Sequence, residues 1–377
     1  MVKKLLITII LFALLFTSPI TVYAEQDYLP DEYVDIEDTL PEDVADKLPD
    51  GVFSDDADEF TSSISELTSW QFIIDYAFDV LGLNVDEAIR AFATILALLA
   101  LCALLNMLKH SLENTALGSA LSLVSSAAII ATVVELSKEP LERAMSLLEY
   151  VRTFINTVSP TMTAMYAMGG NITSALVNNY GLIVFITILD NICISSLEFI
   201  LGICMALAIS SSFIEGNNLS ALSNGIKKAF TFFLGFIMLL FTTVISTQTL
   251  LASKADTITA KTAKLLAMQV IPVVGSTVGE SLRTAGASIE YLRSNVGVAL
   301  IVILIIAILP TIITISIYRL VFIAGNAVSG LLGCSREGTL ILEISSIFGY
   351  VLAILYISSI VVIYLLTIFA KCSSALG

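Results

Sequence analysis

The sequence predicts an all-α, polytopic helical membrane protein with about seven transmembrane helices. Of its 377 residues, 57% are hydrophobic and only 14% are charged, whereas soluble domains average about 45–50% and about 25%. The apolar residues gather in long runs without a charge. Several runs have the ~20 residues that a helix needs to cross a hydrocarbon core about 30 Å thick.

The first segment, residues 1–24, has the pattern of a secretory signal peptide. Lys3 and Lys4 precede an apolar stretch, and Val-Tyr-Ala ends at Ala24 with small residues where a signal peptidase needs them. The apolar stretch is shorter than a membrane span. We therefore expect cleavage after Ala24 in preference to an uncleaved anchor.

The second segment, residues 25–66, is an acidic leader. It holds 16 acids and one base, Lys47, and so accounts for the whole net charge of −15. A segment so rich in acids and proline is typical of disorder, and after a signal peptide it lies outside the cytoplasm. We expect a largely disordered extracytoplasmic leader; a docking tail for a basic partner is the alternative. The chain shows no basic patch for nucleic acid.

The third segment, residues 67–88, is amphipathic and carries the one tryptophan, Trp70. It is typical of an interfacial helix on the lipid bilayer. The multispan helical membrane domain follows over 89–377, with re-entrant candidates at 270–279 and 320–335. Its candidate spans are 91–108, 114–134, 153–168, 172–189, 193–214, 229–251, 295–318 and 344–370.

Basic residues predict the orientation of these spans, since they favour the cytoplasmic side. With the leader outside, Lys109, Lys227, Lys228 and Arg319 face the cytoplasm. The same scheme leaves the five bases of 254–293 outside.

Two connecting segments are amphipathic. Pro140 suits a helix start, and apolar residues recur at helical spacing over 141–155 and again over 282–296. Each stripe packs against its own bundle or against a partner subunit.

The sequence contains few patterns that indicate catalysis or the binding of a metal or cofactor. There is one histidine, the five cysteines are scattered, and neither a phosphate-binding glycine loop nor a nucleophile elbow is present. We expect a protein that is not an enzyme, with no catalytic, metal or cofactor-binding residues. Asp190 and Glu198, which share one side of a helix, face a bundle interior or mark the end of a span.

Interrupted backbone is the other candidate feature. Pro160, Gly169 and Gly170 break one apolar run, and Pro272 removes a backbone donor from another. Gly275 and Gly279 form a GxxxG pair that allows close backbone approach. These are candidate conduit or packing residues, because broken backbone at membrane depth is tolerated only against protein or water; an interfacial turn is the alternative.

The stretch ITAKTAK…VIPVVGSTVGESL, with Lys261, Thr262, Lys264, Pro272 and Gly275, resembles the stage III sporulation protein AE family. The signal peptide, the acidic leader and the multispan body agree with that resemblance. It implies a subunit of the multi-protein channel that joins mother cell and forespore, in the mother-cell membrane around the forespore. Other membrane subunits would be its partners. A self-contained secondary permease and a structural membrane scaffold are the alternatives.

Overall fold

The computed structural model describes residues 33, 36, 40, 42–49, 51–54, 56–111, 116–213, 219–270, 275–372, 374 and 375. In these residues every regular element is a helix. The elements are α3 (Glu42–Ala45), α4 (Ala57–Leu67), α5 (Trp70–Ser111), α6 (Ala116–Met168), α7 (Ile172–Ile188), η2 (Leu189–Ile194), α8 (Ser195–Phe213), α9 (Leu219–Val270), α10 (Gly275–Leu331) and α11 (Ser335–Lys371). The all-α fold class is therefore confirmed.

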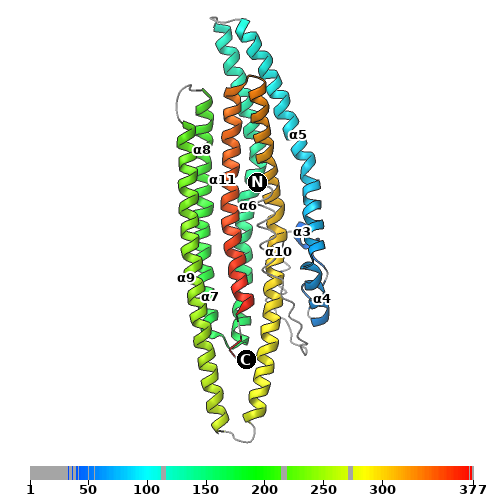
Figure 1. Cartoon of the computed structure of the whole chain (residues 1–377), viewed down its shortest axis with the longest axis vertical. Helices are drawn as coiled ribbons and strands as arrows, with labels where there is room; N and C mark the ends of the chain where they lie inside the picture. Colours follow the sequence, from blue (N-terminus) through cyan, green and yellow to red (C-terminus); the bar gives the residue numbers. More distant parts are fainter. Residues whose placement is uncertain are drawn as a thin grey trace.

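The long helices run side by side along one axis and alternate in direction (Figure 1). The π-helix η2 joins α7 to α8, so that 172–213 is one helical path. The longest helices, α6, α9 and α10, have 53, 52 and 57 residues. At about 1.5 Å per residue each is about 80 Å long. Each thus extends well beyond a hydrocarbon core of about 30 Å.

The centre of the bundle is the α10–α11 hairpin. The most apolar windows of these two helices are 67% and 61% buried, whereas those of the other three membrane-length helices are 22–29% buried. Gly297 of α10 permits their close contact, because a Cβ built there would lie 2.6 Å from the Cβ of Ala370 on α11. The apolar residues left exposed on α5, α7 and α9 are suited to lipid.

Within the described residues, five helices are long and apolar enough to cross a membrane: Gln71–Met107, Ile172–Ser210, Ala221–Thr262, Arg283–Leu331 and Ser335–Lys371. About seven were expected. The predicted spans 172–189 and 193–214 lie on the single α7–α8 path, and 114–134 and 153–168 both lie on α6. The re-entrant candidate 320–335 continues α10 as helix as far as Leu331.

Two prolines behave differently from the expectation. Pro140 was predicted to start a helix and Pro160 to break one, but both lie inside α6. The missing N–H of each proline costs one helical hydrogen bond, and α6 tolerates this loss because it packs against four neighbouring long helices. The predicted break at Gly169 and Gly170 is present between α6 and α7.

Two of the basic residues that the orientation scheme places on one side, Lys227 and Arg319, lie near each other along the bundle. Figure 1 shows the last turns of α5, α8 and α10 at one end of the bundle and the last turn of α9 with the first turn of α10 at the other. Lys227 reaches Glu343, and Ser345 donates to the carbonyl of Arg319. Lys227 and Arg319 therefore lie at the same level of the bundle. Which end faces the cytoplasm stays a prediction.

The described part of the acidic leader is more ordered than its composition predicts. Tyr33 is buried, donates to the carbonyl of Val52 at 3.1 Å and meets the ring of Phe60 edge-on. Burial raises the pKa of the Tyr33 hydroxyl well above its ordinary value, which keeps it a donor. The segment 67–88 does not stand apart as an interfacial helix, since residues 70–88 are the start of α5. The signal peptide and Ala24 lie outside the described residues.

Candidate functional site: buried polar groups of the helical bundle

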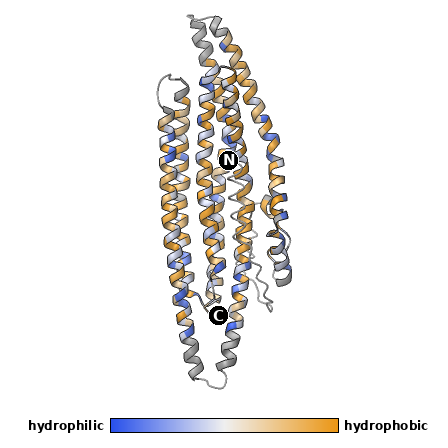
Figure 2. Cartoon of the chain, in the orientation of Figure 1, coloured by the Kyte–Doolittle hydropathy of each residue, from blue (hydrophilic) through white to orange (hydrophobic). Residues whose placement is uncertain are grey.

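Hydropathy varies along the bundle. Figure 2 shows hydrophobic residues over most of the long helices, with hydrophilic residues near the ends of α9 and α10 and along the first half of α5. Polar groups buried between apolar helices are costly unless paired. Three such places stand out.

The first place is a closed polar network between α9 and α11. Lys227 Nζ donates to Ser346 Oγ at 2.8 Å and lies 3.5 Å from Glu343 Oε2, with side chains only 5% and 6% exposed. Asn224 completes the ring, since its Nδ2 donates to Glu343 Oε1 at 3.4 Å and its Oδ1 accepts from Ser346 Oγ at 2.8 Å. A lysine and a glutamate are thus held together in an apolar surrounding.

The second place is the turn between α6 and α7. Gly170 has a φ of 75°, which favours glycine. Asn171, at the N-cap of α7, gives no side-chain cap. Asp256 of α9 supplies one instead: its carboxylate accepts from the backbone N–H groups of Thr173 and Ser174 at 3.0 and 2.8 Å. The negative carboxylate also suits the positive end of the α7 dipole.

The residues after α11 close over the same turn. Ser374 Oγ and Ala375 N both donate to the carbonyl of Gly169 at 3.0 Å. Ser374 N donates to Glu290 Oε2 of α10 at 3.1 Å. Arg293 of α10 lies next to Gly169, and its side chain is fully buried over the ring of Tyr166.

The third place is a cleft of about 740 Å³ between α5, α6, α10 and the leader. Its α10 wall, with Pro310 and Thr314, belongs to the middle of the charge-free run 294–318. Its other walls combine apolar residues such as Val80 and Leu147 with four acids and two bases. These charged residues are Asp79, Glu87, Glu139, Glu142, Lys47 and Arg143.

Polar contacts hold the walls of the cleft together. Arg143 pairs with Glu139 at 2.6 Å and with Glu87 at 3.8 Å. Thr314 Oγ1 donates to Asn84 Oδ1 at 2.6 Å. One face of α10 therefore meets polar side chains of α5 within its charge-free run.

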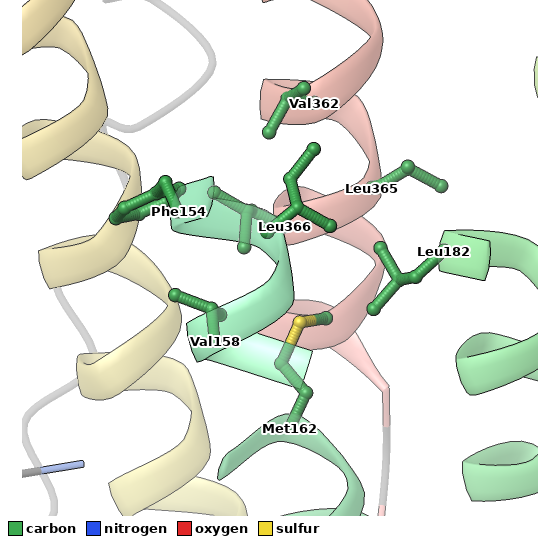
Figure 3. Close-up of a pocket in the computed structure, with 8 residues that line it drawn as sticks. Phe154, Val158, Met162, Leu182, Val362, Leu365 and Leu366 are labelled. Atoms are coloured by element: carbon green, nitrogen blue, oxygen red, sulfur yellow. The ribbon is translucent and has the colours of Figure 1, made fainter. Parts of the chain in front are cut away.

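A second pocket, between α6, α7 and α11, is different. Figure 3 shows its lining, which includes Phe154, Met162, Leu182 and Leu366. Its volume is only ≈ 10 Å³, about the least that one water needs. It is a packing defect of the apolar core and too small for a ligand.

The structure separates the residues that the sequence singled out. Glu198 is exposed on α8, whereas Asp190 lies in η2 with its side chain outside the described part. Lys261 and Thr262 are exposed on α9, close to its end at Val270. Gly275 begins α10 and Gly279 follows in its first turn, while Pro272 and the side chain of Lys264 lie outside the described residues. Of the candidates, Gly169 and Gly170 take part in one of the three places.

Sequence reasoning missed the pairing of Lys227 with Glu343 and the burial of Arg293. Each partner lies far along the chain, and one charge on an apolar helix does not reveal which helix it meets. The interrupted charge-free runs at these three residues were the available signal.

These features define an all-helical protein with several helices of membrane-spanning length and with polar groups enclosed between them. The chain belongs to the stage III sporulation protein AE family, whose model matches residues 56–373. A curated relative, the stage III sporulation protein AE of Bacillus subtilis (strain 168), is 24% identical over 289 residues, which are 74% of this chain and 70% of the relative. No solved structure matches the chain.

Proposed function

We propose that this protein is a non-enzymatic membrane subunit of a multi-protein, secretion-like channel that links mother cell and forespore during endospore formation. Membership of the family indicates a role in sporulation. The observation that carries the finer proposal is the polar cleft beside α10. The mother-cell membrane around the forespore is the location that follows, with the leader on its extracytoplasmic side.

The cleft supports a conduit because of its depth. Its α10 wall includes Ala307, Pro310 and Thr311, in the middle of the 25-residue run 294–318. Ionisable groups at such a depth are expensive in lipid and face water or another protein. In a single copy the cleft is open on one side, so that a second subunit would complete it.

Two alternatives make different predictions. A self-contained permease binds its substrate near broken helices, and the α6–α7 break at Gly170 would suit that. A structural scaffold needs no water-filled cleft. Two observations distinguish these alternatives from a channel subunit: which proteins are bound to the chain, and whether the cleft admits water.

The experiment is purification of the full chain from sporulating cells in mild detergent, followed by identification of the bound subunits. The proposal predicts a complex of fixed stoichiometry. A monomer or homodimer whose melting temperature rises with one small solute would overturn it in favour of a permease. Two charge reversals supply the matched comparison: Glu142→Lys inside the cleft and Lys228→Glu at an exposed position near the start of α9. The former alone should reduce spore formation.

A further inference from the structure

Arg293 is a buried cation without an acceptor. Its side chain is 0% exposed, and Nε, Nη1 and Nη2 have no hydrogen-bond partner in the described structure. Its guanidinium carbon lies 5.4 Å from the centre of the Tyr166 ring. That cation–π contact compensates only part of the cost of removing a guanidinium from water.

The acids nearby are committed to other groups. Asp256 accepts from Thr173 and Ser174 at the start of α7. Glu290, one turn before Arg293 on α10, accepts from Ser374 N. Within the described residues, neither acid forms an ion pair with Arg293.

The surroundings supply a second donor. The hydroxyl of Tyr166 is also buried without a partner in the described structure. Gly169 carries no side chain above the guanidinium; a Cβ built there would lie 3.4 Å from Nη1. Two side chains that can donate hydrogen bonds, Arg293 and Tyr166, thus lie together without an acceptor bound to either, which suits an anion.

The position of Arg293 in the sequence indicates which anion it would bind. It directly precedes the charge-free run 294–318 of α10. In a bilayer whose hydrocarbon core covers that run, Arg293 would lie at the level of the headgroups. Phosphate is the anion concentrated at that depth. A guanidinium binds it through two parallel N–H···O bonds, which an ammonium does not provide.

We propose that Arg293, with Tyr166 and Gly169, forms a binding site for a phosphate group, carried by an anionic phospholipid or free in solution. Ser374 and Ala375 cover the site through their bonds to Gly169. The phosphate enters when this cover is lifted, and it neutralises the buried charge. This site is independent of the cleft and of the channel proposal.

The test uses the full chain purified in mild detergent, with native mass spectrometry and phosphorus analysis. The wild-type protein should retain one phosphate-bearing molecule per chain, and Arg293→Met should lose it and melt at a lower temperature. Arg283→Met, at an exposed position on the same helix, should do neither. If Arg293→Met does not accumulate, Arg293→Lys replaces it and should retain less phosphorus than wild type.

Two arms distinguish the sources. Delipidated protein is titrated with inorganic phosphate or reconstituted with phosphatidylglycerol, and the melting temperature is followed. A rise with the lipid alone indicates a headgroup, and a rise with both indicates the phosphate itself. Wild-type protein without bound phosphorus and without a rise in either arm, or an Arg293→Met variant that melts higher than wild type, would overturn the proposal, since removal of an unpaired buried charge stabilises.

Discussion

At the scale of single residues, the buried polar side chains specify which helices meet. Lys227 and Glu343 are 116 residues apart in sequence, yet they join α9 to α11 with Asn224 and Ser346. A mismatched register would leave either charge buried and unpaired, at a cost of several kcal/mol. The network therefore fixes the register of α9 on α11.

Removing one charge of this network should be worse than removing both. Glu343→Leu leaves Lys227 buried without its partner, and we expect a loss of about 3–5 kcal/mol in the free energy of unfolding. The double variant Lys227→Met/Glu343→Leu should recover most of that loss. Unfolding in detergent, arranged as a double-mutant cycle, measures both. If the loss in the double variant equals the sum of the losses in Lys227→Met and Glu343→Leu alone, the two side chains are not coupled.

The close approach of α10 and α11 depends on Gly297. Gly297→Ala places a methyl group against Ala370, and overpacking of this kind costs about 1–3 kcal/mol. Gly202→Ala is the matched control, because no atom lies within 4 Å of a Cβ built there; the better helix propensity of alanine should make it neutral or slightly stabilising. Melting temperatures of the two variants decide this, and equal values would refute the close contact.

At the scale of elements, the start of α7 depends on a residue of α9. Asp256→Ala removes the acceptor for Thr173 and Ser174, and loss of a helix cap costs about 0.5–2 kcal/mol. We expect a lower melting temperature and faster hydrogen exchange at 172–175. Lys254→Ala, exposed one half-turn earlier on α9, should change neither. An unchanged exchange rate in Asp256→Ala would mean that α7 is capped in another way.

The α9–α10 connection, which carries the stretch quoted for the family, should tolerate change poorly. Gly275→Leu puts a branched side chain at the first residue of α10, where GxxxG spacing suits backbone contact. Lys261→Glu reverses an exposed charge, a change ordinarily worth well under about 1 kcal/mol. Both variants should accumulate in the membrane and fail to support spore formation, whereas Lys228→Glu should sporulate. Normal sporulation of both would make this connection a passive one.

Some elements follow from local sequence and others do not. The helices follow from their charge-free runs, and the break after Met168 follows from Gly169 and Gly170, because glycine reaches a positive φ without strain. The course of α6 through Pro140 does not, since tertiary packing outweighs one lost hydrogen bond. The candidate sites were least accessible to prediction. Arg293 reads as one base among five in 254–293, and only the fold shows that it is buried over Tyr166.

At the scale of the whole molecule, the apolar runs of α5 and α10 are staggered along the axis of the bundle. Cys334 Sγ approaches the carbonyl of Leu99 at 3.9 Å, so the apolar run of α5 packs beside the end of α10. The polar first half of α5 then lies beside the middle of α10, where Tyr76 donates to the carbonyl of Ile306. The apolar run of α5 and the charge-free run 294–318 of α10 therefore lie at different levels of the bundle. This stagger produces the polar cleft that supports the channel proposal.

The most direct measurement is the accessibility of that cleft in sporulating cells. A variant with its five native cysteines replaced receives one cysteine, at Thr311 in the cleft or at Phe236 on the exposed apolar face of α9. Each is treated with a small, water-soluble thiol reagent. We predict that Thr311→Cys is labelled at membrane depth and Phe236→Cys is not, because the first faces water and the second faces lipid. If Thr311→Cys is as unreactive as Phe236→Cys, the cleft holds no water and the protein does not line a conduit there.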